Sequence, residues 1–258
     1  MDLQDSLQNE IRWAFRGQSQ DFGTLIPSFQ REFSRQSHPA AQLIEARLIS
    51  DFRTHYATLP DRSSDMPRPD QIDARYDLRC LSVMQHYEIP TRLVDWTSNF
   101  WIAVYFACAS APGLQAELWC YDRALFDAQR WQNQSLVSLL NTTMQPPTEP
   151  QFLGLRDSEL LVELDPKITP RMKQQQAHHT VSANVFSDHA PLLAALADSV
   201  PSPTATLRRI LIAASCKPKA LQFLADHQKL TAGTIFPDVV GLGRFLRWQF
   251  ESLRTMLL

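Results

Sequence analysis

Long apolar runs are absent from this 258-residue chain, and no stretch approaches the roughly 18 consecutive apolar residues of a membrane-spanning helix. The first ten residues, MDLQDSLQNE, are acidic and polar, and no apolar segment typical of a secretory signal follows them. The sequence therefore predicts neither a membrane-spanning helix nor a secretory signal. We therefore expect a cytoplasmic protein without membrane partners.

Cysteine and net charge are also scarce. The four cysteines lie far apart and show no CxxC or His-x-Cys spacing, so no zinc site or other metal site is expected. Cys108 and Cys120 lie in apolar segments, where cysteine usually packs as a small core residue. The formal net charge of -2 predicts no general attraction to phosphate backbones. A local basic groove remains compatible with this balance.

The remaining composition, 44% hydrophobic and 20% charged, is typical of a globular protein. Periodicity predicts strands over 11–17, 117–121, 160–166 and 207–213, the last of them buried on both faces, and helices over 41–59, 74–88, 99–110 and 217–230. Strands and helices mix without a βαβ rhythm, which favours an α+β fold with mostly antiparallel small sheets and flanking helices. We expect one domain over residues 1–258, with loop insertions near 60–73 and 133–150.

Three ionisable residues, His86, Arg92 and Asp95, lie within ten positions in an otherwise apolar segment. Burying such groups is costly unless they pair with each other or bind a ligand. Arg92 and Asp95 therefore form either a structural ion pair or ligand contacts. His86 is either a core histidine bonded to a carbonyl group or a proton-transfer residue.

Two other positions have comparable alternatives. Arg16 lies near the end of the first predicted strand and precedes Gly17, where the backbone can approach a ligand closely. Its planar guanidinium suits a pyrophosphate. The alternative is a salt bridge at the end of the strand. Thr97 and Ser98, with Asn99, are suited to capping the helix that follows, and they are also suited to presenting hydroxyl groups to an anion.

Several motifs together resemble the FRG domain, a bacterial and phage family named from the tripeptide Phe15-Arg16-Gly17. The similarity continues through the following positions: Ile26-Pro27, Arg31, Gln85-His86-Tyr87, Pro90-Thr91-Arg92-Leu93, Asp95-Trp96-Thr97, Tyr105-Phe106-Ala107, Arg171, Gln175, Ile235-Phe236-Pro237-Asp238 and Gly241. Two positions depart from the family pattern, because Glu88 and Ala177 stand where the family usually has glycine. Glycine alone reaches positive φ cheaply, so Glu88 bears on a tight turn.

The FRG family is in turn distantly similar to ADP-ribosyltransferases, and this similarity implies an ADP-ribosyltransferase-like fold with NAD as substrate. It implies that Arg16 and Gly17 contact the phosphates and that Gln85, Arg92, Asp95 and Thr97 contribute to the cofactor site. The implied activity is cleavage of the glycosidic bond of NAD in a toxin or phage-defence setting. A protein or nucleic acid is the expected acceptor of ADP-ribose.

The acid that such chemistry needs is not fixed by the motifs. Glu159, Glu163 and Gln175 are candidates, although a glutamine cannot supply the negative charge that stabilises an oxocarbenium ion. Together with Arg16 and His86, we take Glu163 and Gln175 as the predicted catalytic residues. His178 and His179 are neighbours and would point to opposite faces of a strand, which disfavours a metal site. A non-catalytic module that binds nucleotide or nucleic acid through Arg16 and Arg92, or a plain interaction domain, are the alternatives.

Overall fold

A computed structural model describes residues 13–33, 41–59, 68–69, 77–126, 160–165, 169–199, 207–237, 241–243, 245–247 and 250. The predicted loop insertion near 133–150 lies outside these residues, as does that near 60–73 except for 68–69. Of the helices that the structure describes, none combines the length and apolar character needed to cross a membrane.

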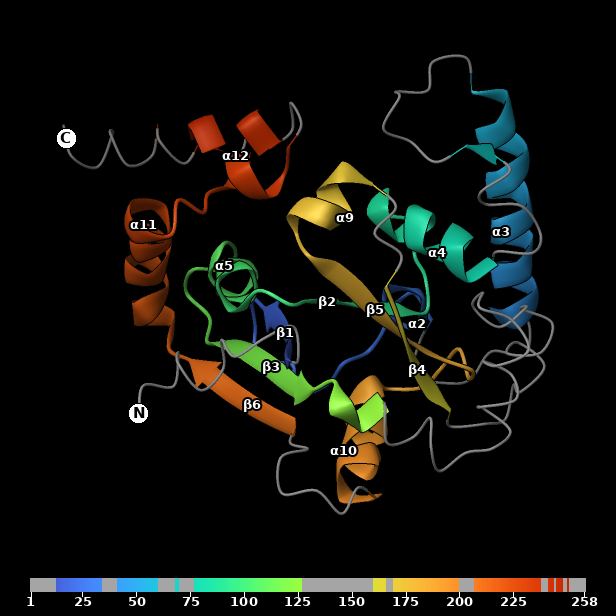
Figure 1. Cartoon of the computed structure of the whole chain (residues 1–258), viewed down its shortest axis with the longest axis horizontal. Coiled ribbons are helices and arrows are strands. Elements are labelled where there is room, and N and C mark those ends of the chain that lie inside the picture. The colour runs from blue at the N-terminus through green and yellow to red at the C-terminus, as the bar shows by residue number, and fades with distance from the viewer. Residues whose placement is uncertain are drawn as a thin grey trace.

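Six strands form one antiparallel sheet with the order β4-β5-β2-β1-β3-β6 (Figure 1). Their bounds are β1 Trp13–Gln18, β2 Leu93–Thr97, β3 Ala116–Asp122, β4 Leu161–Leu164, β5 Ala177–Ser182 and β6 Leu207–Ile212. The α+β class is confirmed. The expectation of several small sheets is wrong for the described strands, because they join into a single sheet.

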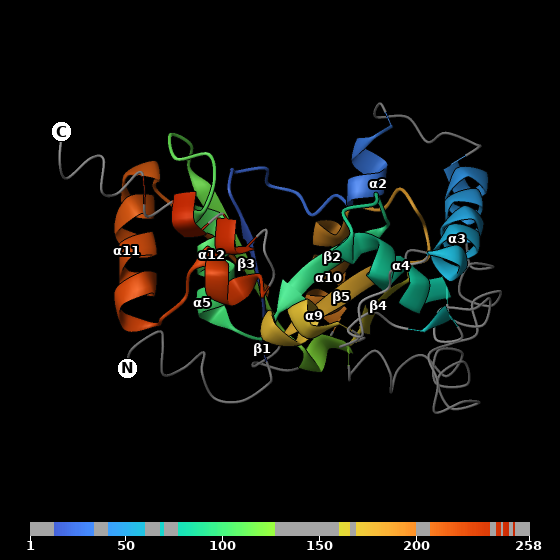
Figure 2. The same ribbon diagram turned by 90° about the horizontal axis from the view of Figure 1, so that it is seen from above.

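Helices cover this sheet on both faces (Figures 1 and 2). They are α2 Ser28–Arg31, α3 Ala41–Thr58, α4 Asp77–His86, α5 Phe100–Cys108, α9 Pro170–Gln174, α10 His189–Ser199, α11 Lys217–His227 and α12 Ala232–Ile235. The four helices that periodicity predicts are confirmed as α3, α4, α5 and α11. Periodicity predicted neither the short α9 nor α10.

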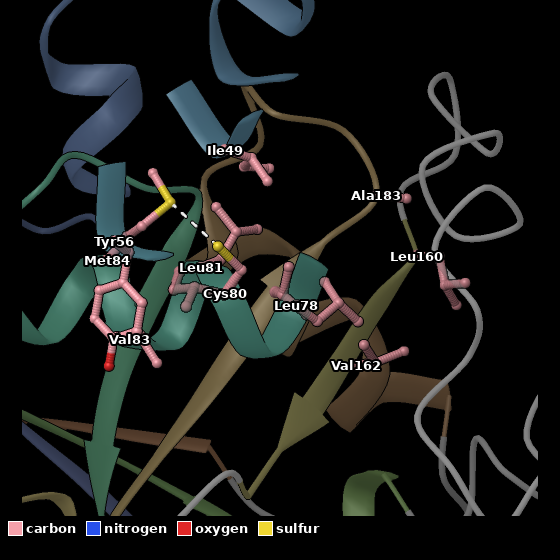
Figure 3. Packing of buried hydrophobic residues seen from close by; sticks show 12 residues of the cluster. Ile49, Tyr56, Leu78, Cys80, Leu81, Val83, Met84, Leu160, Val162 and Ala183 are labelled. Carbon is pink, nitrogen blue, oxygen red and sulfur yellow. Dashed lines mark hydrogen bonds between the residues drawn. The ribbon is translucent and has the colours of Figure 1, made fainter. Parts of the chain in front are cut away.

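Alternation along the strands separates two apolar layers. On β1, Ala14 packs in a cluster with Leu193 of α10, whereas Phe15 packs in a cluster with Ala103 of α5. Successive side chains of a strand point to opposite faces, so α5 and α10 lie on opposite faces of the sheet. A third cluster joins α3 and α4 to the sheet through buried residues such as Leu81 and Met84 (Figure 3).

Gly17 allows α5 to cross β1 closely. A Cβ atom added at Gly17 would lie 1.9 Å from the carbonyl oxygen of Ala103 and 2.5 Å from the backbone nitrogen of Ala107. Any side chain at this position would therefore push α5 off the sheet. The glycine of the FRG tripeptide has a packing role in addition to its place beside Arg16.

The strand at 207–213 was expected to be buried on both faces, and this expectation is wrong. In β6, Arg208, Arg209 and Leu211 are exposed. β6 is the edge strand beyond β3, and a sheet edge is covered less completely than a central strand. Adjacent aliphatic residues alone did not distinguish a central strand from an edge strand.

Candidate active site

A cleft of about 250 Å³ opens on the face of the sheet that carries α5. Strands β1, β2 and β5 form its floor, and α4, α5 and α9 form its walls. The lining residues are Phe15, Arg16, Gly17, Gln85, His86, Asp95, Trp96, Thr97, Ala103, Phe106, Arg171, Met172, Gln175, Ala177 and His179. Most of the residues that the sequence selected for a ligand site therefore meet at one place.

Asp95 supplies a carboxylate to this cleft, and no other Asp or Glu occurs among its described lining residues. It lies opposite His179 in the ladder between β2 and β5, and 2.9 Å separates its Oδ1 from the Nδ1 of His179. Its Oδ2 accepts a hydrogen bond of 3.0 Å from the Nε2 of Gln85. The Asp95 side chain is 49% exposed, whereas that of His179 is 3% exposed. The carboxylate is thus held from one side and faces the cleft with the other.

The charge of Asp95 is maintained by its neighbours. Burial by itself raises the pKa of Asp95, but hydrogen bonding and charge from His179, the charge of Arg16 and the hydrogen bond from Gln85 together lower it to about 2. The group is therefore ionised throughout the neutral range. It is suited to stabilising positive charge and unsuited to donating a proton.

Arg16 follows Phe15, which pairs with Thr97 in the register between β1 and β2. The backbone carbonyl of Asp95 accepts a 2.8 Å hydrogen bond from Nη1 of Arg16. Burial lowers the pKa of Arg16, and the Asp95 carboxylate partly offsets this effect. Arginine nevertheless remains charged in proteins. Arg16 thus places a positive charge beside Asp95 and holds the backbone of β2.

Gln85 is oriented by a hydrogen-bond relay. The hydroxyl group of Thr91 donates to Oε1 of Gln85 at 2.6 Å, which fixes the amide so that Nε2 faces Asp95. Thr91 is itself held, since its backbone N–H donates to Oγ of Ser28 at 3.0 Å. The end of α4 and the start of β2 are therefore joined through the Gln85 side chain.

His86 follows Gln85 at the end of α4 and also lines the cleft. Its Nδ1 lies 3.4 Å from Oγ1 of Thr169, which caps α9 by accepting from the backbone N–H of Met172. Since that oxygen already accepts one bond, its own hydrogen is available to His86. Half-buried and at the cleft wall, His86 is placed for contact with a ligand and is not enclosed in the core.

The hydroxyl group of Thr97 is engaged with backbone. It donates to the carbonyl of Gln175 at 2.7 Å and accepts from the N–H of Asn99 at 3.0 Å. Asn99 is the residue that caps α5, accepting from the N–H groups of Trp101 and Ile102. Thr97 lines the cleft but joins β2 to the end of α9, and the capping interpretation is confirmed for Asn99.

Gln175 also lines the cleft, and its Nε2 lies 3.4 Å from the carbonyl of Ile235 in α12. Gln176, the next residue, has φ 47°, a left-handed conformation that turns the chain from α9 into β5. Glu88 has φ 63° in the turn after α4. A non-glycine residue therefore holds a left-handed conformation in this turn at some conformational cost.

Arg92, which the resemblance assigns to the cofactor site, lies outside the cleft, and the alternative of an ion pair with Asp95 is not formed either. Arg92 is 3% exposed and pairs with the equally buried Glu45 of α3, with its Nε 2.8 Å from Oε1 of Glu45. Its Nη1 donates to the carbonyl groups of Ser182 and Ala183. The N–H groups of Arg92 thus donate to acceptors inside the protein, namely the Glu45 carboxylate and the two carbonyl groups.

Glu163 is not among the lining residues either. Its carboxylate accepts from Tyr121 Oη at 2.8 Å and from Arg123 Nε at 2.7 Å, which ties β4 to β3 and the residue after it. The prediction that Glu163 is the acid of the cleft is therefore corrected: Asp95 is the carboxylate there. Glu159 lies outside the described residues.

Sequence reasoning missed His179, Phe106 and Arg171 as site residues. A signal existed for His179, because consecutive histidines in a strand must send one ring to each face. The partner opposite His179 depends on the β2–β5 register, which the sequence does not reveal. Within the described residues, no group of three or more His, Cys, Asp or Glu side chains is arranged to hold a metal ion.

Comparison with known proteins identifies one relationship. Residues 11–114 match the family model of the FRG domain, a segment that contains β1, β2, α4, α5 and the Asp95 side of the cleft. No curated protein matches the chain, and no solved structure does.

Proposed function

We propose, for a chain that carries an FRG domain, that the cleft binds NAD and cleaves the bond between nicotinamide and ribose in the manner of an ADP-ribosyltransferase. The observation that carries this proposal is the ionised, half-exposed Asp95 at the floor of a cleft that also contains Arg16 and Arg171. Among the described residues that line the cleft, Asp95 is the one negative charge beside cationic and apolar groups, an arrangement matched to a ligand that bears both a cation and phosphates.

The chemistry of NAD explains why one carboxylate is enough. Nicotinamide is a cation while attached and leaves as a neutral base, so the electron pair of the breaking C–N bond returns to the ring nitrogen without a general acid. Positive charge then develops on the ribose. A fixed carboxylate beside that carbon stabilises the charge, and removal of a comparable preorganised group costs about 10²–10³-fold in rate.

An oxygen nucleophile completes the reaction. Its oxygen bonds to the ribose carbon, and its proton must pass to a base. His86, on the wall of the cleft, is the group that we assign to this step, because a ring nitrogen of an imidazole can accept a proton. The nucleophile is water or an acceptor group on a protein or nucleic acid.

The apolar wall of the cleft suits the nicotinamide ring. Phe15 and Phe106 line it together with Ala103, and aromatic side chains favour edge or offset contacts with a flat ring. The volume of about 250 Å³ is below the roughly 300–1,000 Å³ typical of pockets for drug-sized ligands. We therefore infer that the nicotinamide ribose enters the cleft and the adenosine half lies at its mouth. Family resemblance supports a cytoplasmic role in bacterial conflict, as a toxin or a phage-defence factor.

Incubation of the purified protein with NAD, followed by quantification of free nicotinamide, tests this proposal. Release above the rate of the buffer blank, with a rise in melting temperature on addition of NAD, is the expected result. Stabilisation by NAD without any release would instead establish the non-catalytic nucleotide-binding module. Absence of both effects would exclude NAD as the ligand.

A further inference from the structure

The geometry points to His179 as the residue that binds the 2′-hydroxyl group of the nicotinamide ribose, so that the cleft takes ribonucleotides in preference to 2′-deoxyribonucleotides. This inference rests on the proposed function, and it adds a contact that determines specificity. Three observations carry it, namely an unpartnered ring nitrogen of His179, the place of this ring on the floor of the cleft, and its closeness to Asp95.

The two ring nitrogens of His179 differ in their surroundings. Nδ1 lies 2.9 Å from Oδ1 of Asp95. Nε2 is buried, in a side chain that is 3% exposed, and no described group forms a hydrogen bond with it. Burial of a polar atom without a partner costs free energy, so such atoms are rare in folded proteins and call for an explanation such as a functional role. Nε2 is therefore available to a polar group of the ligand.

The strand register places His179 on the floor of the cleft. In the ladder between β5 and β2, His179 pairs with Asp95. Both residues line the cleft, as do Ala177 and Thr97, the pair two positions along. Successive side chains of a strand point to opposite faces, so His179 faces the cleft and its neighbour His178 faces away from it. Nε2 is the ring nitrogen farther from the backbone, so it stands above the floor that the two strands form.

A second unpartnered nitrogen belongs to the same cleft. Nε of Arg16 is buried and makes no hydrogen bond within the described part of the chain. Arg16 lies on β1 and His179 on β5, the two strands that flank β2, and both side chains contact Asp95 of β2. Unpartnered nitrogens supplied from both neighbouring strands indicate a site that binds a polar group, rather than an isolated packing defect.

The position of Asp95 selects the polar group that His179 meets. The proposed function places the anomeric carbon of the ribose beside the Asp95 carboxylate. One carbon atom separates the two nitrogens of an imidazole, so Nε2 lies within a few ångströms of that carboxylate and reaches atoms next to the anomeric carbon. The 2′-hydroxyl group is the polar group on the neighbouring carbon. A hydroxyl group both donates and accepts, so it pairs with Nε2 whether or not this nitrogen carries a proton.

Such a contact makes the cleft selective for ribose. A site that hydrogen-bonds a hydroxyl group of its substrate disfavours the analogue that lacks it, because the buried polar group of the protein then stays unpaired. The same contact holds the ribose so that its anomeric carbon faces Asp95, where positive charge develops during the proposed cleavage.

Calorimetric titration with two probes tests the contact. ADP-ribose keeps the ribose that carries nicotinamide in NAD, and 2″-deoxy-ADP-ribose lacks only the hydroxyl group in question. The wild-type protein is expected to bind the deoxy probe about tenfold more weakly, the scale of one hydrogen bond to a buried group. Equal affinity of the wild type for the two probes would overturn the inference, as would absence of ADP-ribose binding.

Two substitutions at position 179 assign the effect to the ring nitrogen. His179→Asn keeps an amide near the position of Nδ1 but does not reach that of Nε2, whereas His179→Gln does. We expect the affinities of His179→Asn for the two probes to agree within about twofold, and His179→Gln to retain part of the discrimination. A purely structural role of His179 would weaken both probes equally and leave their ratio at the wild-type value, which would overturn the inference.

His86→Asn is the matched control, because His86 is the other histidine that lines the cleft. We expect it to keep the wild-type ratio between the two probes. Loss of the ratio in His86→Asn with its retention in His179→Asn would assign the hydroxyl contact to His86 and overturn the inference.

The failure of this inference can be distinguished from failure of the proposed function. Discrimination between the probes that depends on His179, without nicotinamide release from NAD, would uphold the hydroxyl contact and refute the catalytic proposal. Nicotinamide release by a protein whose probe ratio is the same in His179→Asn as in wild type would do the reverse.

Discussion

Arg92 and Asp95 lie three residues apart, yet their surroundings differ in kind. Arg92 is 3% exposed and faces Glu45 and two carbonyl groups, so its donors and charge are satisfied inside the protein. Asp95 is 49% exposed, although Gln85 and His179 hold its oxygens from one side. Arg92, whose charge is paired inside the protein, has a structural role. Asp95 is held in place but faces the cleft, so its charge is available to a ligand.

The largest effect is expected on the architectural side of this comparison. Arg92→Ala should lower the free energy of unfolding by about 3–5 kcal/mol, because it leaves Glu45 as an uncompensated buried charge. Urea unfolding followed by circular dichroism measures this change, with Arg208→Ala on exposed β6 as the control. A variant that keeps its stability but loses NAD binding would move Arg92 into the site.

The free energy of unfolding should fall on acidification because of the buried His189. Burial, with the charges of Arg16 and Arg92, lowers the pKa of His189 to about 3, whereas an unfolded histidine titrates near its ordinary value of 6.5. The unfolded state therefore takes up a proton first, and stability falls by up to about 1.4 kcal/mol per pH unit below pH 6.5, down to about pH 3. His189→Gln should remove this slope in pH-dependent urea unfolding.

Asp95 contributes in a different pH window. Its folded pKa, lowered to about 2, lies below its ordinary value of 3.8, so its stabilising contribution is present above about pH 4 and is lost between pH 4 and 2. An Asp95→Asn variant should therefore retain the His189 slope between pH 6.5 and 4. If that slope disappeared in Asp95→Asn, the two groups would not be independent as described.

The smallest effect concerns the turn that leads from α4 toward β2. Glu88 is exposed at φ 63°, and glycine adopts this conformation without strain, so Glu88→Gly should raise the free energy of unfolding by about 0.5–1 kcal/mol. Glu32, exposed at φ -73°, is the matched control, and Glu32→Gly should be destabilising instead. Equal effects of the two substitutions in thermal unfolding would contradict the strain argument.

Sequence pattern predicted the local structure well where periodicity was strong. The strand that contains Arg16 and the helix that begins after Asn99 were both expected. Gln85, His86 and Asp95 line one cleft, whereas Arg92 does not. Pairing could not be predicted, because the partner of Arg92 lies 47 positions away in α3 and that of Asp95 depends on the β2–β5 register. Proximity in the sequence therefore suggested a pair between Arg92 and Asp95, whereas the fold supplied Glu45 and His179.

The acid of the site illustrates the same limit. The sequence offers Glu163 as one candidate acid on a predicted strand, but in the structure Tyr121 and Arg123 donate to its carboxylate. For Asp95 the sequence left open whether the carboxylate pairs with Arg92 or contacts a ligand, and it did not single out Asp95 as the acid. Only the three-dimensional arrangement showed which carboxylate faces the cleft.

The proposed cleavage of NAD depends on the negative charge of Asp95. Asp95→Asn keeps the shape of the side chain and removes its charge, and Asp198→Asn on the exposed surface of α10 is the control. We predict that nicotinamide release from NAD falls by about 10²–10³-fold in Asp95→Asn and stays at the wild-type rate in Asp198→Asn. Release by a folded Asp95→Asn protein within about threefold of the wild-type rate, where electrostatic stabilisation predicts orders of magnitude, would contradict the account.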